Sequence, residues 1–293
     1  MAATAAERWA QRRSFHHSRY SAEQIAAVRE VSVTACLPAR ECAVTIGPTV
    51  AQLAGLREAG AIDEVLVVDA ASVDGTAAIA EQAGARVVQE AELAPAQGPV
   101  LGKGDAMWRA LAAIESDVVV FLDADVTEFS AHYATGLLGP LIEEPQVSFV
   151  KAFYERPLTH EGVELPGGGG RVNHLLARPA LALFYPELAE IRQPLAGEVA
   201  ARRELLTALP FTTGYGVEVA MLIDAWQRVG LDGLAQVDLG LHRNRSQPLS
   251  ALTPMAASVL ATIARRVSAE GRLHGVPDTA PPERPAYDSL STA

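Results

Sequence analysis

The chain has 293 residues, of which 49% are hydrophobic, so it can bury a large core in one domain or in one domain with an appended lobe. Its formal net charge of -11 argues against nucleic acid or an anionic membrane surface as a partner. No apolar run reaches the length of a membrane span, and the first twenty residues lack the apolar core of a signal peptide, so we expect a cytoplasmic protein. The two cysteines, Cys36 and Cys42, are too few for a disulfide framework.

Short apolar strands alternate with helices through the first half of the chain. We expect strands at residues 31–37, 65–69, 86–89 and 118–122, with helical segments at 46–56, 72–83 and 105–114. Pro38 is expected to end the first of these strands. The alternation predicts an α/β fold whose mostly parallel sheet is covered by helices on both faces.

The pattern changes from about residue 140. Strands are expected at 147–154 and 235–239, and helices at 171–184, 202–209, 217–229 and 252–269. The chain is thus divided into an N-terminal extension at 1–30, a first domain at 31–140, a second α+β part at 141–270 and a disordered, proline-containing tail at 271–293.

Two carboxylates follow the fourth predicted strand directly, in Asp123-Ala124-Asp125. If the strand continues, both carboxylates point to one side, at the sheet edge where open α/β folds bind ligands. Hard oxygen ligands at such a place suit Mg²⁺ or Mn²⁺ carrying phosphate groups. The alternative is an ordinary solvated turn.

Two glycine-containing loops precede predicted helices. Gly102-Lys103-Gly104 offers a close backbone approach and a positive charge for a phosphate or a base edge, or else it is a turn with a solvated lysine. Gly167–Gly170, followed by Arg171 and Asn173, is suited to cradle a phosphate or a carboxylate, or else it is a surface linker.

Two further positions carry possible chemistry. Tyr215 lies between two glycines and precedes Glu218 by three residues; both side chains can bind hydroxyl groups, although Glu218 can also cap a helix. His242 follows the last predicted strand, where it could complete a metal site begun by Asp125 or play a structural part.

Taken together and in order, these motifs resemble the glucosyl-3-phosphoglycerate synthase and mannosyl-3-phosphoglycerate synthase family, which are retaining glycosyltransferases of the GT-A fold. The resemblance runs from about residue 31 to residue 249. It rests on nine segments: Leu-Pro-Ala at 37–39, Gly-Lys-Gly at 102–104, Asp-Ala-Asp at 123–125, Lys-Ala-Phe-Tyr-Glu-Arg-Pro-Leu at 151–158, Gly-Gly-Gly-Arg-Val at 168–172, Ala-Arg-Pro at 177–179, Gln-Pro-Leu-Ala-Gly-Glu at 193–198, Gly-Tyr-Gly-Val-Glu at 214–218 and His-Arg-Asn at 242–244.

The resemblance implies that a hexose, glucose being favoured over mannose, is transferred from a nucleotide sugar to D-3-phosphoglycerate with Mg²⁺ (or Mn²⁺) as cofactor. The donor would be UDP-glucose, GDP-glucose or GDP-mannose, the protein would be a homodimer, and retention would follow from attack on the face of the leaving diphosphate. The implied nucleotide-sugar site consists of Pro38, Ala39, Arg40, Glu41, Lys103, Asp123, Ala124 and Asp125. The implied metal ligands are Asp125 and His242, the acceptor site is Gly170, Arg171, Asn173, Tyr215 and Asn244, and the catalytic residues are Asp125, Glu218 and Arg171.

Three departures from the family pattern concern the base pocket and the metal. Arg40-Glu41-Cys42-Ala43 replaces the segment that carries the usual base-binding carboxylate, and Ala70 stands where relatives tend to have serine. His242 lies about two residues early, so that a gapless match places Asn244 at the histidine position; we favour His242.

Two other classes share part of this pattern. A sugar-phosphate nucleotidyltransferase has similar strands and metal chemistry but would carry a glycine-rich N-terminal fingerprint, which residues 38–45 lack. A non-catalytic nucleotide-sugar-binding domain would have little use for the intact carboxylates of Asp123 and Asp125.

Overall fold

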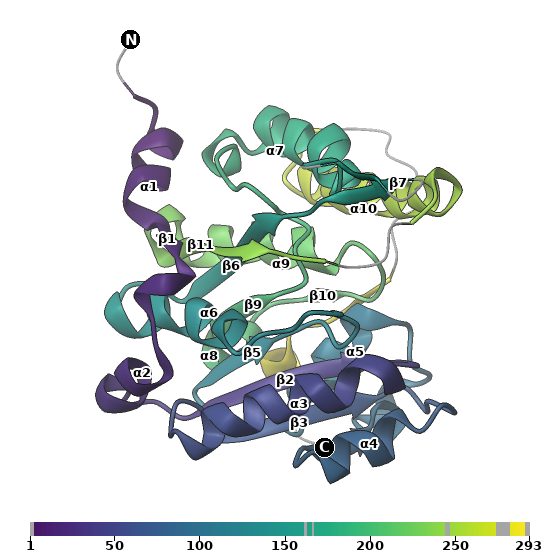
Figure 1. Cartoon of the computed structure of the whole chain (residues 1–293). Coiled ribbons are helices and arrows are strands. Elements are labelled where there is room, and N and C mark those ends of the chain that lie inside the picture. Colours follow the sequence, from purple (N-terminus) through teal and green to yellow (C-terminus); the bar gives the residue numbers. More distant parts are fainter. Residues whose placement is uncertain (1–2, 161–162, 166, 244–246, 274–281, 291–293) are drawn as a thin grey trace.

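The computed structural model describes residues 3–160, 163–165, 167–243, 247–273 and 282–290. Its centre is an eight-stranded sheet in the order β1-β11-β6-β9-β5-β2-β3-β4 (Figure 1). Neighbouring strands are parallel except at β9, which lies antiparallel between β5 and β6. The expected α/β fold with a mostly parallel sheet is confirmed.

The first half contains the predicted parallel strands; the apolar runs of β2, β3 and β5 are buried, whereas the edge strand β4 is partly exposed. Figure 1 shows α3 lying along β2 and β3. The strands are β2 (Val33–Ala39), β3 (Glu64–Asp69), β4 (Arg86–Gln89) and β5 (Val118–Phe121), and the helices are α3 (Ala43–Glu58), α4 (Thr76–Gln82) and α5 (Lys103–Ala110).

Pro38 does not end its strand, contrary to expectation. It lies within β2, opposite Val68 of β3. The pairing with β5 on the other side stops at Cys36 and Phe121. Proline is tolerated there because no neighbouring strand needs its missing N–H.

The second half adds three strands to the same sheet: β6 (Phe149–Glu155), β9 (Val199–Arg202) and β11 (Leu234–Leu241). Strand β9 was not predicted, because Val-Ala-Ala-Arg is short and contains few strongly strand-forming residues. The helices are α6 (His132–Glu143), α7 (Arg178–Phe184), α8 (Arg203–Thr207), α9 (Val217–Val229) and α10 (Leu249–Ala269). A π-helical turn, Asn173–Ala177, precedes α7, and a hairpin pairs β7 (Leu158–His160) with β8 (Val163–Leu165).

The N-terminal segment is part of the sheet, whereas we expected an extension. After α1 (Ala5–Arg13), β1 (Ser14–His16) pairs parallel with β11, and α2 (Ala22–Val28) follows. Trp9 is fully buried and donates its indole N–H to the Leu234 carbonyl at 3.0 Å. A three-residue strand is too short to be recognised from hydrophobic periodicity.

The C-terminal segment is also packed where the structure describes it, which corrects the expectation of a disordered tail for residues 282–290. Strand β12 (Glu283–Arg284) pairs antiparallel with β10 (Phe211–Thr212). Arg284 contacts the Asp105 carboxylate at 2.7 Å, and Tyr287 lies 4.6 Å from the Trp108 ring centre. A few specific contacts therefore hold a segment that its composition suggested would not fold.

Helices cover both faces of the sheet. Apolar residues of α3, α4 and α6 form the core on one face, and those of α5, α7, α8, α9 and α10 form the core on the other. Both cores contain residues from both halves of the chain. In the part of the chain that the structure describes, no helix is long and apolar enough to cross a membrane.

Candidate active site

The two carboxylates after β5 lie in a turn, because the strand ends at Phe121 and does not continue through them. The turn is tied down on two sides: Thr45 donates its hydroxyl to the Ala124 carbonyl at 2.7 Å, and Thr127 donates to the Arg243 carbonyl at 3.0 Å. The second bond places the turn beside the segment that carries His242. Gly197 packs so closely on Asp123 that a Cβ there would lie 2.3 Å from the carboxylate.

Lys103 joins two motifs that are far apart in the sequence. Its Nζ lies 2.6 Å from Asp123 Oδ1 and 3.0 Å from Glu218 Oε1. Lys103 is the first residue of α5, and Glu218 lies in the first turn of α9. Burial works against the Lys103 charge, but the charges of Asp123 and Glu218 outweigh it and raise the pKa of Lys103. Gly104 allows the start of α5 to pack against β10, since a Cβ there would lie 1.9 Å from the Thr212 carbonyl oxygen. Lys103 and Asp123, both expected in the nucleotide-sugar site, are in contact, and Glu218 belongs to the same cluster.

His242 lies in a buried, aromatic setting. Its ring is stacked on Tyr154 with 4.2 Å between centroids, and its side chain is 1% exposed. Burial and the nearby charge of Arg156 lower the pKa of His242 to about 4. The imidazole is therefore neutral near pH 7, which is the form that binds metal ions.

Glu198 lies next to His242; it belongs to the quoted motif at 193–198, but no role was assigned to it from the sequence. Its carboxylate is fully buried, has no hydrogen-bond partner of ordinary geometry among the described residues, and lies 3.9 Å from His242 Nδ1. Burial and the charge of Asp123 raise the pKa of Glu198 to about 7. A buried carboxylate is costly unless donors or positive charges compensate it, and the Tyr154 hydroxyl and the Lys103 charge partly offset the rise in the pKa of Glu198.

The residues expected to bind a metal fit that role chemically. Asp125 is exposed on the turn, and Nδ1 of the neutral His242 has no hydrogen-bond partner among the described residues. No cluster of three metal-ligating side chains occurs in the described ranges. One carboxylate and one imidazole are nevertheless sufficient for an ion that takes its other ligands from substrate phosphates and water.

The residues expected to bind the nucleotide lie at the ends of β2 and β3. Pro38 and Ala39 pair with Val68 and Asp69. Glu41 has a left-handed backbone (φ 52°), and its carboxylate accepts a hydrogen bond from the Val73 N–H at 3.0 Å. It thus connects the two loops above this sheet edge, while Arg40 is exposed.

The acceptor residues are distributed less compactly. Arg171 donates a hydrogen bond to the Gln247 carbonyl, and Gly170 has a positive φ of 67°. Asn173 is buried, and its side-chain oxygen accepts a hydrogen bond from the Leu195 N–H at 2.9 Å. Tyr215 is 62% exposed near the start of α9. Asn244 lies outside the described residues.

Comparison with known proteins places this geometry in a family. The glycosyl transferase family 2 model matches residues 34–163. The glucosyl-3-phosphoglycerate synthase of Petrotoga mobilis is 38% identical over 268 residues, covering 89% of this chain and 82% of the relative. That of Mycolicibacterium smegmatis is 42% identical, covering 88% and 86%. The chain belongs to the glucosyl-3-phosphoglycerate synthase family.

Solved structures of this family superpose on nearly the whole chain. A mannosyl-3-phosphoglycerate synthase from Rubrobacter xylanophilus is 40% identical with a TM-score of 0.89, covering 97% of this chain and 99% of that one. A glucosyl-3-phosphoglycerate synthase from Mycobacterium tuberculosis, crystallised with Mn²⁺, UDP-glucose and phosphoglyceric acid, is 37% identical with a TM-score of 0.81, covering 92% and 95%. The expected membership of the family and its GT-A fold are confirmed.

Two buried residues of this synthase-family site were quoted in the motifs without a role. Lys151 donates to the Ala196 carbonyl at 2.5 Å, and burial lowers the pKa of Lys151 to about 8. This bond and the one from the Ala152 N–H to the Glu198 carbonyl hold the segment 196–198, whose Gly197 packs against Asp123. The sequence did offer a sign that Lys151 has a special role: it lies within the apolar strand segment 147–154, and a buried charge rarely occurs without a specific partner.

Proposed function

We propose that the protein transfers glucose, with retention of configuration, from UDP-glucose to the hydroxyl of D-3-phosphoglycerate, using a divalent cation such as Mg²⁺ or Mn²⁺. The observation that carries the proposal is the cluster of Asp123, Lys103 and Glu218 beside Asp125 and His242. It lies at the carboxyl ends of the strands, where α/β folds bind nucleotides. The M. tuberculosis structure with Mn²⁺, UDP-glucose and phosphoglyceric acid supports the choice of donor, metal and acceptor.

The donor would lie over the ends of β2, β3 and β5. Pro38, Ala39, Arg40 and Glu41 would line the nucleotide side, and Asp123 to Asp125 would face the ribose and diphosphate. Asp125 and His242 would hold the cation, which supplies positive charge to the departing diphosphate. Lys103 keeps Asp123 ionised and in place, so it would orient the donor without contributing a proton.

The acceptor would approach from the side of Gly170, Arg171 and Asn173, with Tyr215 and Asn244 near it. Positive charge and backbone N–H groups there suit an anionic acceptor. Holding its hydroxyl close to the anomeric carbon is the main contribution that such a site makes to the rate.

Retention is best explained by attack on the face of the leaving diphosphate. Glu218 is the candidate for a carboxylate nucleophile, but its oxygen is 3.0 Å from the Lys103 ammonium group. An ion-paired carboxylate is a weaker nucleophile than a free one, because attack would separate the pair. Glu218 would instead accept hydrogen bonds from the sugar, and a diphosphate oxygen would take the proton of the acceptor hydroxyl.

Mannose transfer from GDP-mannose is the second candidate. It is favoured by the Rubrobacter mannosyl-3-phosphoglycerate synthase, which superposes with a TM-score of 0.89. Glucose and mannose differ only in the orientation of one hydroxyl group, and a few contacts are enough to distinguish the two.

A donor screen tests the proposal. Purified protein, Mg²⁺ and D-3-phosphoglycerate are mixed separately with UDP-glucose, GDP-glucose and GDP-mannose, and the product mass and released nucleotide are measured. We expect hexosyl-phosphoglycerate with UDP-glucose at the highest rate. A higher rate with GDP-mannose would support the second candidate, and no product with any donor would contradict both.

We also propose that the protein is a cytoplasmic homodimer in which residues 31–140 supply most of the donor site and residues 141–270 supply the acceptor site within one continuous sheet. Light scattering coupled to gel filtration measures the mass directly. A mass near the chain mass of 30.9 kDa would contradict the dimer.

A further inference from the structure

A cavity of about 560 Å³ lies at the carboxyl ends of β6, β11 and β1, next to the glycine run. It is lined by residues of three motifs that carry the family resemblance and have no role so far: Arg156, Arg178 and Gln193. Arg192 and His174 complete the basic part of its wall. Unassigned motifs from distant parts of the sequence therefore meet in one hollow.

The arginines of this cavity have no carboxylate partner among the described residues. Arg192 lies over the Phe153 ring at 4.6 Å, and Arg156 over the Tyr154 ring at 5.9 Å. Arg178 has a buried Nε without a hydrogen-bond partner. In a chain of net charge -11, unpaired arginines around one hollow are unexpected unless an anion binds there.

The remaining charged groups on the wall do not neutralise these arginines. Glu155 is exposed, and Asp238 accepts a hydrogen bond from the Gly240 N–H at 2.9 Å. The His16 Nδ1 atom forms a hydrogen bond with the Ser18 hydroxyl at 2.8 Å.

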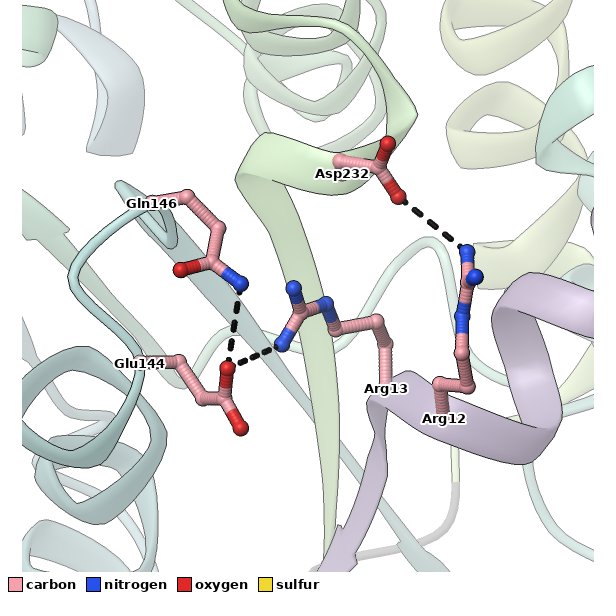
Figure 2. Close-up of a pocket in the computed structure, with 5 residues that line it drawn as sticks. All are labelled: Arg12, Arg13, Glu144, Gln146 and Asp232. Atoms are coloured by element: carbon pink, nitrogen blue, oxygen red, sulfur yellow. Dashed lines mark hydrogen bonds and ion pairs between the residues drawn. The ribbon is translucent and has the colours of Figure 1, made fainter.

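A second hollow on the molecule gives a direct contrast. Figure 2 shows its charged side chains paired with one another. Arg13 lies 2.6 Å from Glu144, and Arg12 lies 3.3 Å from Asp232. Those charges are already satisfied, so that hollow offers no comparable attraction for an anion.

The arginine cavity borders the proposed reaction centre. Tyr154 lines the cavity and also stacks on His242. The charge of Arg156 contributes to lowering the pKa of both His242 and Asp123. The glycine run is joined to the cavity wall by a hydrogen bond from the Gly169 N–H to the Arg156 carbonyl at 2.9 Å. Gly167 and Gly169 themselves line the cavity, so the glycine run and the arginines border the same space.

We infer that the arginine cavity binds the carboxylate of the acceptor, while the glycine run and Arg171 hold its phosphate. This inference rests on the proposed function. Backbone N–H groups and flexible glycines suit a phosphate, and planar arginine forks suit a planar carboxylate. Two separate anion subsites make the enzyme selective for an acceptor that carries a charged group at each end.

The experiment compares Arg178→Gln and Arg192→Gln with wild type and with Arg228→Gln, which removes an exposed arginine on α9 outside the cavity. Acceptor KM, donor KM and kcat are measured with Mg²⁺ for 3-phosphoglycerate and for glycerol 3-phosphate, which lacks the carboxylate, and for glycerate, which lacks the phosphate. Binding of 3-phosphoglycerate to each Mg²⁺-loaded protein is measured by calorimetry, independently of turnover.

We expect each cavity variant to raise the acceptor KM about 10- to 100-fold with an unchanged donor KM, and to lose most of the wild-type preference for 3-phosphoglycerate over glycerol 3-phosphate. The Arg228→Gln protein should behave as wild type. Acceptor constants equal to those of Arg228→Gln would overturn the inference, as would loss of the preference over glycerate, since the cavity would then hold the phosphate. Absence of turnover by wild type with every acceptor would count against the proposed function, whereas the calorimetry still decides whether the cavity binds the anion.

Discussion

At the site, a lysine lies between two carboxylates that would otherwise repel each other. Asp123 and Glu218 would repel each other across the site, but the Lys103 ammonium group contacts both carboxylates. Lys103 is partly exposed, and these two partners outweigh the cost of its partial burial, as the raised pKa of Lys103 indicates. Asp125 is exposed on the same turn, where it would hold the proposed divalent cation.

Replacing Asp125 by alanine should remove transfer without unfolding the protein. We expect kcat to fall at least about 100-fold, because one protein ligand of the cation is lost. The melting temperature should stay close to that of wild type, since the residue is exposed. The measurements are initial rates over a range of Mg²⁺ concentrations and a thermal denaturation curve. Asp232→Asn, an exposed carboxylate paired with Arg12 on another surface, is the matched control. Full activity of the Asp125 variant at high Mg²⁺ would refute the metal assignment.

The sequence indicated which residues belong to the site, but it did not indicate which of their side chains contact one another. Lys103, Asp123 and Glu218 were each singled out, but only the fold shows that one lysine contacts both acids. Glu198 was missed as a functional residue because its significance depends on His242, which is 44 positions later. Hydrophobic periodicity carries no information about contacts at that separation.

Among the elements, those with a clear apolar pattern were predicted well, including the four-residue strands β4 and β5, whereas several other short strands were missed. Helix α9 has the predicted bounds, and β3 and β4 agree with them within one residue. Strands β1, β9, β10 and β12 are held by partners from distant parts of the chain, so their own residues give little local signal.

The short strand β12 is predicted to contribute to stability through Arg284. Its guanidinium contacts Asp105, which is fully buried; among the described residues, Arg109 at 3.2 Å would be the counter-ion left to Asp105. We expect Arg284→Met to lower the free energy of unfolding by about 3 kcal/mol at pH 7, measured by urea denaturation. Arg12→Met, which removes an exposed ion pair, should cost less than about 1 kcal/mol.

The effect of Arg284→Met should depend on pH in a defined direction. Burial opposes ionisation of Asp105, but the bonds from Arg284 and neighbouring groups lower the pKa of Asp105 below its usual 3.8. A carboxylate with a depressed pKa in the folded state stabilises the fold above its unfolded pKa and loses this effect as the pH falls through the folded value. The difference between wild type and Arg284→Met should therefore be constant from pH 5 to 7 and shrink below about 3.8. A difference that does not change with pH would show that the loss is one of packing alone.

For the whole molecule, the sheet does not stop where the sequence suggested a domain boundary. Strands from residues 33–121 and from residues 149–241 belong to the same sheet, joined through the pairing of β5 with β9. Both apolar cores contain residues from both halves. Composition changed near residue 140 because the connections become irregular there, while the sheet itself continues.

A shared sheet and shared cores predict one cooperative unfolding transition, since neither half can lose its structure without exposing the apolar surface of the other. Tryptophan reports on each half separately: Trp108 lies on α5 of the first half and Trp226 on α9 of the second. Two variants each keep one reporter: Trp9→Phe/Trp226→Phe keeps Trp108, and Trp9→Phe/Trp108→Phe keeps Trp226. Within each protein we expect the urea midpoint from fluorescence to equal the midpoint from far-UV circular dichroism. Both midpoints come from the same protein, so the cost of its substitutions affects them equally. Fluorescence midpoints that differ from the circular dichroism midpoint in opposite directions would establish two independently folding domains and restore the boundary near residue 140.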